Sequence, residues 1–300
     1  MYLRFNAVAV CDGAAIQSWS CGKECAATLS SFDNGSQILI GPTGEYNVHG
    51  YVTRLNAASC LVVIAGTSFY NWRNIRADLE FWLTSWPSGG AGSTSARCPA
   101  AWCRGCKVMK GFAAAYEEIR PEIFAAVRQL ACPSLVFSGH SLGGAIATQA
   151  ALEALLKPGC SCPCHFVAAE QCIESHAGLW TYGMPRVGNE AFANVFVATA
   201  RALQQLPPMW RVARDFDLIP QVPPRWLGYC HIPWAVRYLK GDSEWIICRE
   251  ELEDPECTYP GGTMADHHNY FGITGTDENA ASIECVSLLS LQRKHEQRQS

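Results

Sequence analysis

Short apolar runs alternate with longer segments of helical period along most of the chain. Continuous apolar runs predict buried strands, and apolar residues that recur every three or four positions predict helices. The strands predicted in this way are 37–40, 61–65, 134–137, 179–182 and 209–213. The predicted helices are 74–86, 111–130, 145–156 and 190–205, and Pro121 is expected to kink or break the second of them. This alternation predicts an α/β fold with a mostly parallel sheet and crossover helices.

The segments between the predicted elements are loops and insertions, and none of them marks a domain boundary. Residues 1–30 carry three cysteines and little clear pattern, and 88–95 is a loop rich in Gly and Ser. Residues 157–176 form an insertion rich in Cys, Pro, Gly and Ser. No internal repeat and no domain linker is visible, so residues 1–300 are expected to form a single domain.

Composition and charge narrow the class of protein. The chain has 300 residues, of which 49% are hydrophobic and 17% are charged, with a formal net charge of −4. No cluster of basic residues is visible, which argues against a nucleic-acid partner. No apolar run approaches the length of about 18 residues that would span a membrane. Arg4 and Asn6 interrupt the first apolar stretch, so no signal peptide is expected in the chain as given.

The cysteine content points to an oxidising compartment. Sixteen cysteines are too many for a typical reduced protein, and several are closely spaced. Zinc is the second interpretation, but only Cys103-Arg-Gly-Cys106 has the spacing of a zinc-binding pair. Together with the sequon Asn34-Gly35-Ser36, the cysteines predict an extracellular, disulfide-bonded protein.

The strongest chemical signal is the pentapeptide Gly139-His140-Ser141-Leu142-Gly143. It lies between a predicted strand and a predicted helix, which is the context of a nucleophile elbow. Such a turn lifts the serine hydroxyl above the sheet, and the following helix directs its N-terminus toward developing negative charge. The context predicts that Ser141 is the nucleophile of a serine hydrolase.

A serine nucleophile needs a base, which is usually a histidine oriented by a carboxylate. In this class of fold the three residues follow the order Ser, Asp or Glu, and His. His165, His176 and His295 lie in or beside the insertion or in a charged tail. His231, His267 and His268 remain, and spacing leaves the choice among these three open.

The motifs resemble those of the class 3, fungal-type triacylglycerol lipases from about residue 2 to residue 275. The segments that carry the resemblance are 139–145 (GHSLGGA), 180–189 (WTYGMPRVGN), 217–220 (DLIP) and 266–272 (DHHNYFG). The resemblance implies an α/β-hydrolase fold, in which a mostly parallel central sheet has helices on both faces and a helical lid.

Residue by residue, the resemblance implies Ser141 as nucleophile, Asp217 as orienting carboxylate and His267 as base. Asp215 and His268 are their local competitors. The oxyanion hole would take the backbone N–H of Leu142 and, by resemblance, Thr67. The stretch after Gly66 is longer than usual in the family, so Ser68 is the alternative to Thr67.

The resembling lipases carry a lid in the segment that corresponds here to about 68–90. Its apolar residues include Ile75, Leu79, Phe81, Trp82 and Trp86. An amphipathic segment with Trp, Phe and Leu suits a lipid–water interface, although an ordinary core helix would show the same pattern. The lid favours a lipase that acts on acylglycerols. The alternatives are an esterase of soluble esters such as feruloyl esters, a phospholipase A1, and a non-catalytic lipid-binding protein.

The resemblance also implies a set of disulfides and no metal or cofactor. The expected local pairs are Cys21–Cys25, Cys103–Cys106 and Cys248–Cys257, and Cys11–Cys285 is expected to tie the two ends of the chain. The insertion is expected to form disulfides of its own. The cysteines whose pairing stays open are Cys60, Cys98, Cys132, Cys160, Cys162, Cys164, Cys172 and Cys230. The expected partners are an ester or lipid substrate and its interface, and the chain is expected to act as a monomer.

Overall fold

The fold is described from a computed structural model. The structure describes residues 1–66, 81–86, 103–156, 176–202, 209–239, 244–249, 252–259 and 261–273. Several subjects of the predictions above lie outside these residues: Thr67, Ser68, Ile75, Leu79, the loop 88–95, Cys98, the insertion at 157–175, Cys285 and His295. They stay predictions.

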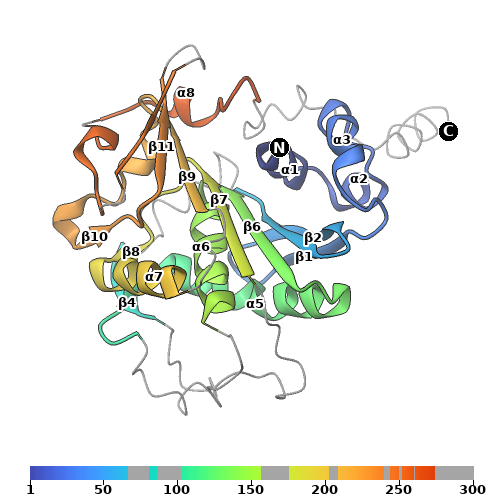
Figure 1. Cartoon of the computed structure of the whole chain (residues 1–300), viewed down its shortest axis with the longest axis horizontal. Coiled ribbons are helices and arrows are strands. Elements are labelled where there is room, and N and C mark those ends of the chain that lie inside the picture. Colours follow the sequence, from blue (N-terminus) through green and yellow to red (C-terminus); the bar gives the residue numbers. More distant parts are fainter. Residues whose placement is uncertain are drawn as a thin grey trace.

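An eight-stranded sheet forms the centre of the molecule (Figure 1). Its spatial order is β1 (Ile38–Thr43), β2 (Val48–Asn56), β3 (Ser59–Ile64), β6 (Ser134–His140), β7 (His176–Tyr182), β9 (Met209–Arg214), β11 (Ala235–Tyr238) and β12 (Trp245–Ile247). The strands from β3 to β11 pair in parallel, whereas β1, β2 and β12 pair antiparallel at the two edges. The predicted α/β-hydrolase architecture is confirmed.

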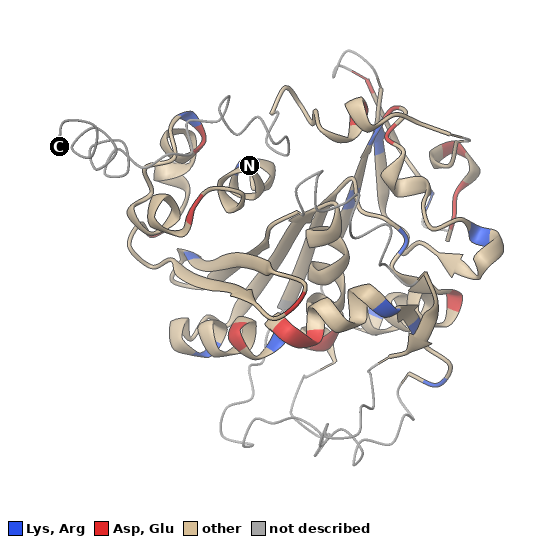
Figure 2. Ribbon diagram, turned by 180° about the vertical axis from the view of Figure 1, so that it is seen from behind, with Lys and Arg blue, Asp and Glu red and all other residues tan. Residues whose placement is uncertain are grey.

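Both faces of the sheet are buried, which explains why its strands read as continuous apolar runs. Along β3, Cys60, Val62 and Ile64 face one core, and Leu61 and Val63 face the other. The first core lies under α5 (Lys110–Leu130), α6 (Leu142–Leu155) and α7 (Glu190–Ala202), and the second lies under α1 (Tyr2–Ala9). Figure 1 shows these two groups of helices on opposite sides of the sheet. Figure 2 shows acidic and basic residues on both sides of it.

The N-terminal region, where the sequence shows little pattern, contains three helices. They are α1, α2 (Gly13–Ser18) and α3 (Lys23–Thr28). Helices of six to eight residues are too short to be stable alone. Packing stabilises them. The buried ring of Trp19 packs against Phe5 and against Tyr51 of β2.

Of the two effects expected of Pro121, a kink or a break, the break is wrong, because α5 continues through Pro121 from Lys110 to Leu130. Proline removes one hydrogen bond, the one that would reach the carbonyl of Glu117. Pro121 and Glu117 are both exposed. Water can therefore satisfy the carbonyl that loses its partner.

The predicted helix 74–86 is wrong over its last residues. Leu83–Ser85 forms strand β4, which pairs antiparallel with β5 (Lys107–Met109). A small second sheet joins these strands to β8 (Gly188–Asn189) and β10 (Tyr229–Cys230), in the order β10-β8-β5-β4.

Trp86, predicted as a lid residue, belongs to the core. It is 4% exposed, and its ring meets Phe192 edge-on with 5.2 Å between the centroids. Phe81 and Trp82 precede β4 and are 37% and 72% exposed. Pairing with β5 holds this end of the segment in the fold.

Four disulfides join described cysteines. Cys21–Cys25, Cys103–Cys106 and Cys248–Cys257 are the local pairs that the resemblance implies. The fourth, Cys60–Cys132, joins the start of β3 to the turn before β6. The sequence left the pairing of these two cysteines open. Cys230 is the free cysteine among the described residues. No described helix is long and apolar enough to cross a membrane.

Candidate active site

Ser141 stands on the sharp turn between β6 and α6. Its backbone has φ 56° and ψ −128°, a conformation that non-glycine residues rarely adopt. Gly143 lets this turn pass close to the neighbouring strand, because a Cβ there would lie 2.3 Å from the Ile64 carbonyl oxygen. The turn is the nucleophile elbow that the sequence predicts.

The structure brings Ser141, His267 and Asp217 together in one hydrogen-bonded chain. The distance from Ser141 Oγ to His267 Nε2 is 2.9 Å, and His267 Nδ1 lies 3.0 Å from both carboxylate oxygens of Asp217. All three residues are buried. A carboxylate only accepts, so Nδ1 carries the proton and Nε2 is left to accept the hydrogen bond from the Ser141 hydroxyl.

Asp217 is held by donors that the sequence does not reveal. The backbone N–H of Ile219 donates to Oδ1 at 2.9 Å, and the Tyr270 hydroxyl donates to Oδ2 at 2.5 Å. The Tyr259 hydroxyl donates to the Asp217 backbone carbonyl at 2.8 Å. Burial, and then the charge of Asp217, raises the pKa of Tyr270 well above its usual 10. Tyr270 therefore remains a proton donor at any working pH.

His267 ends the short helix α8 (Met264–His267), which is capped by Thr263. The Thr263 N–H donates to the Phe216 carbonyl at 2.7 Å, and an isolated parallel bridge joins Thr263 to Asp217. The loop that carries the carboxylate and the loop that carries the imidazole are thus hydrogen-bonded to each other.

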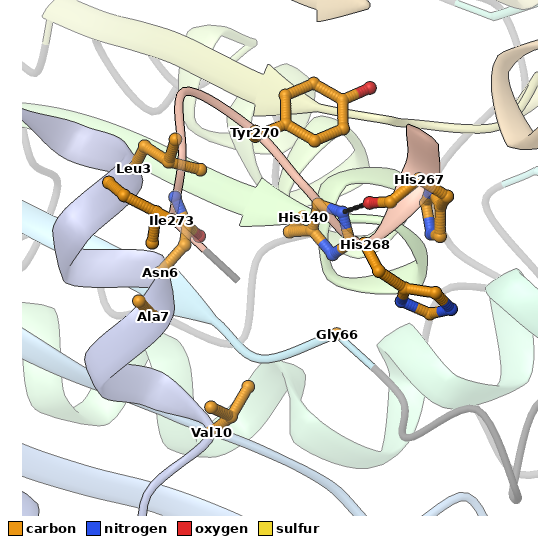
Figure 3. A pocket seen from close by; sticks show the side chains of 10 residues that line it. All are labelled: Leu3, Asn6, Ala7, Val10, Gly66, His140, His267, His268, Tyr270 and Ile273. Atoms are coloured by element: carbon orange, nitrogen blue, oxygen red, sulfur yellow. Dashed lines mark hydrogen bonds between the residues drawn. The ribbon is translucent and has the colours of Figure 1, made fainter. Parts of the chain in front are cut away.

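His140, which directly precedes Ser141, contacts His267 through a hydrogen bond and a ring stack. Its Nε2 lies 3.0 Å from the His267 carbonyl oxygen, and the two rings stack with centroids 4.5 Å apart (Figure 3). The carbonyl only accepts, so Nε2 carries the proton. Burial, and after it the neighbouring His267, lowers the pKa of His140 well below 6.5. The ring is therefore a neutral donor that orients the backbone of His267.

Gly183 leaves the space in which Asp217 and His267 meet. Its φ is 57°, and a Cβ there would lie 2.8 Å from Asp217 Oδ2 and 2.9 Å from His267 Nδ1. The sequence places this glycine in a family motif but does not indicate its contact with the pair.

The local competitors of the three residues have other partners. Asp215 pairs with Arg237 at 3.5 Å. The ring of buried His231 bonds to the Pro220 carbonyl through Nε2 at 2.7 Å. His268 meets the His267 ring edge-on with centroids 5.5 Å apart. Of the three histidines left open by spacing, only His267 faces Ser141.

The surroundings of Ser141 include one predicted oxyanion donor. Leu142 is the first residue of α6, so its backbone N–H has no acceptor in a preceding turn. Gly66 lies alongside, because a Cβ on it would be 3.6 Å from Ser141 Cβ. Thr67 and Ser68 lie outside the described residues.

Among the described residues, one cluster has metal-ligand geometry, and it consists of Cys248, Asp254 and Cys257. The two sulfur atoms of this cluster are bonded to each other, so neither is available as a thiolate ligand.

Comparison with known proteins agrees with the fold and shows the family. A family model described as "Lipase (class 3)" matches residues 61–226, more than half of the chain. A lipase of Rhizomucor miehei is 29% identical over 274 residues, which cover 85% of this chain and 62% of the relative. The Fusarium solani protein named "Secreted mono- and diacylglycerol lipase 1" is 34% identical over 212 residues, 69% of this chain and 53% of the relative. The chain spans less than two thirds of each relative.

A solved structure extends the likeness to the whole fold. It is that of a triacylglycerol lipase described as having a serine protease triad as its catalytic centre. It aligns with a TM-score of 0.64 and 27% identity, over 91% of this chain and 94% of that one.

Proposed function

Because the chain belongs to the class 3 lipase family, we propose that it is a serine hydrolase that cleaves carboxylic ester bonds of acylglycerols at a lipid–water interface. The single observation that carries the proposal is the ordered contact of Ser141 Oγ, His267 and Asp217 at 2.9 and 3.0 Å. The order of these residues along the chain is the order of this hydrolase class.

The reaction proposed is acyl transfer in two steps. His267 Nε2 takes the proton of the Ser141 hydroxyl as its oxygen attacks the ester carbonyl, and the resulting imidazolium protonates the leaving alcohol. A water molecule, deprotonated by the same nitrogen, then attacks the acyl-enzyme carbonyl, and the imidazolium returns the proton to Ser141 Oγ as the bond to the acyl group breaks and the acid leaves. Asp217 stays ionised throughout and stabilises the imidazolium. No metal or cofactor takes part.

The tetrahedral oxygen needs donors that are in place before it forms. The proposed donors are the backbone N–H of Leu142 and a group of Thr67. The position of Leu142 at the N-terminus of α6 supports the first, because the helix dipole adds positive potential there. Gly66 beside Ser141 supports the second, since the segment that carries Thr67 starts there.

An acylglycerol substrate is supported by the family and by the name of the Fusarium relative. The exposed Phe81 and Trp82, within the proposed lid segment, agree with action at an interface. The disulfides and the secreted relative support an extracellular location. A monomer is proposed as the working form.

Two experiments test the proposal. A fluorophosphonate probe should label the folded protein and should not label the Ser141→Ala variant. Hydrolysis of tributyrin should rise steeply once the ester exceeds its solubility and forms droplets. Failure of labelling would refute the hydrolase, whereas equal rates below and above the solubility limit would refute interfacial action and favour an esterase of soluble esters.

A further inference from the structure

Four consecutive carbonyl groups of the loop that carries Asp217 accept hydrogen bonds from only two residues. We call residues 215–223, which follow β9, the Asp217 loop. The four carbonyls are those of positions 220–223, and the donors are Arg186 and His231. The distances are 2.7 Å from His231 Nε2 to the Pro220 carbonyl, 2.5 and 3.2 Å from Arg186 Nη1 to the carbonyls of Gln221 and Pro223, and 2.9 Å from the Arg186 N–H to the Val222 carbonyl. Two side chains and one backbone N–H therefore satisfy a stretch of backbone that has no regular partner strand.

Both donors are held by one buried carboxylate, that of Glu253. It accepts from Arg186 Nε at 2.7 Å, from Arg186 Nη2 at 2.9 Å and from the backbone N–H of His231 at 2.6 Å. The side chains of Arg186 and Glu253 are 3% and 2% exposed. A bidentate pair of this kind has a fixed geometry, so the remaining nitrogen of Arg186, Nη1, is directed at the Asp217 loop.

His231 offers a single donor, and the Asp217 loop takes it. The Pro220 carbonyl only accepts, so Nε2 carries the proton. Burial, and after it the charge of Arg211, lowers the pKa of His231 well below 6.5, so the ring is neutral. Nδ1 has no hydrogen-bond partner among the described residues. An unpaired buried nitrogen is unfavourable, and packing alone therefore does not account for a histidine at this position.

The backbone that these donors hold also holds the catalytic carboxylate. The Ile219 N–H donates to Asp217 Oδ1 at 2.9 Å, and Ile219 opens the 3₁₀ turn Ile219–Gln221. Pro220, whose carbonyl is bonded to His231, is the next residue of that turn. A movement of the turn at Pro220 would therefore displace the N–H that holds Oδ1.

We propose that Arg186 and His231 are positioning residues that hold the Asp217 loop, and with it the carboxylate that orients His267. The inference rests on the proposed function, because it concerns the same reaction. Both residues act through backbone carbonyls of the loop. Their loss should lower kcat, since the carboxylate must stay in line while the imidazolium forms, and should leave KM nearly unchanged.

The first test compares two variants of His231. Leucine and glutamine have similar size, but only glutamine keeps an N–H donor near the position of Nε2. Hydrolysis of dissolved p-nitrophenyl acetate is measured and divided by the concentration of sites that a fluorophosphonate labels to completion, so that unfolded protein does not count. His231→Leu should lower kcat by roughly tenfold, the effect of about one hydrogen bond, with KM within about twofold. His231→Gln should recover most of the loss.

The second test compares two Arg→Lys variants at buried bidentate pairs. Lysine keeps the charge but lacks the planar fork of arginine. Arg186→Lys should lower kcat by at least about tenfold, because an ammonium cannot reach Glu253 and the loop carbonyls with the same geometry. Arg120→Lys is the matched control, since Arg120 Nε and Nη2 each lie 2.6 Å from Glu153, near the end of α6 opposite Ser141. Its kcat should stay within about twofold of the parent.

Three results would overturn the proposal: parental kcat in His231→Leu, an equal loss in His231→Leu and His231→Gln, or an equal loss in Arg120→Lys and Arg186→Lys. If Arg186→Lys does not fold, the two His231 variants decide the question by themselves.

The outcome is separable from that of the proposed function, because the bond between His267 and Asp217 can be observed without substrate. The Nδ1 proton of His267 should give a low-field ¹H NMR signal in the parent and in His231→Gln, and the signal should be shifted or lost in His231→Leu. A parent that hydrolyses no ester but shows this pattern would refute the enzyme and keep the positioning role. A parent that hydrolyses esters, with signal and kcat unchanged in His231→Leu, would keep the enzyme and refute the positioning role. A parent with neither activity nor signal would refute both.

Discussion

Replacing Tyr270 by Phe removes one hydroxyl that touches the Asp217 carboxylate. Asp217 is fully buried, and three groups donate to its carboxylate: Ile219 N–H, His267 Nδ1–H and the Tyr270 hydroxyl. A phenylalanine ring fits the same buried space, so the change creates no cavity. It leaves a buried charge with two donors instead of three.

A hydrogen bond to a charged group contributes about 1.5–3 kcal/mol. The folded state loses part of this contribution whether or not substrate is present, and that part should appear as a lower free energy of unfolding. The rest holds the carboxylate in line with His267 as the imidazolium forms. We expect kcat to fall by roughly tenfold, which corresponds to about 1.4 kcal/mol, with KM unchanged because Tyr270 donates to Asp217 and not to substrate.

The assay is the steady-state hydrolysis of a dissolved p-nitrophenyl ester, with urea unfolding of the same samples. Tyr238→Phe is the matched control, because Tyr238 is equally buried, packs 5.6 Å from Tyr270, and donates to the Asn269 carbonyl rather than to Asp217. The control should keep kcat within about twofold. A folded Tyr270→Phe variant with parental kcat would refute the idea that this hydroxyl orients the carboxylate.

Three further predictions concern other parts of the structure. Gly183→Ala should fold poorly or lose at least about 100-fold in kcat, since its Cβ would lie 2.8 Å from Asp217 Oδ2; parental activity in a soluble variant would contradict the crowding. Burial alone would raise the pKa of Glu253, but its hydrogen bond to Arg186 lowers it to about 2. The stability from this depressed pKa is present above the unfolded value near 4.5 and is lost as pH falls toward 2, so melting temperatures of Glu253→Gln and the parent should converge over that range. Removing the Cys60–Cys132 disulfide, which closes a loop of 72 residues, should cost about 4 kcal/mol in urea unfolding; a loss below about 1 kcal/mol would show that the disulfide barely constrains the unfolded chain.

The central sheet was predictable because its strands are buried on both faces. A run such as 61–65 has no polar position to obscure it, and the strand found is Ser59–Ile64. The N-terminal helices were not predictable in the same way. Helices such as Gly13–Ser18 have too few residues to show a period, and tertiary packing determines their conformation.

The error at Leu83–Ser85 has a similar cause. The apolar residues of this stretch suit a helix face as well as a strand, and the pairing that selects the strand comes from Lys107–Met109, more than 20 residues later. Periodicity within one segment holds no information about such a partner. Trp86 is likewise compatible with a lid or a core until Phe192 is placed against it.

The candidate site shows the same division. Ser141 carries a local signal, since the elbow needs glycine two positions before and two positions after the nucleophile. His267 carried none that separated it from His231 and His268, and the family resemblance selected it. Tyr259 contacts the Asp217 backbone, and Gly183 lies beside the Asp217 carboxylate. Both come from distant segments, so the spacing of residues near Asp217 does not predict them.

The bonds between the Asp217 loop and Thr263 also bear on how the protein becomes active as it folds. Ser141 and His267 are separated by 126 residues, and Asp217 and His267 by 50. Closing such long loops is entropically unfavourable. We therefore expect the sheet that contains β3, β6, β7 and β9 to form the elbow of Ser141 before the loop with Thr263 and His267 docks against it. Under mild denaturation we expect this loop to detach while the sheet persists, so that turnover disappears before the core unfolds. Catalytic activity would then report how firmly the last described segment of the chain is docked.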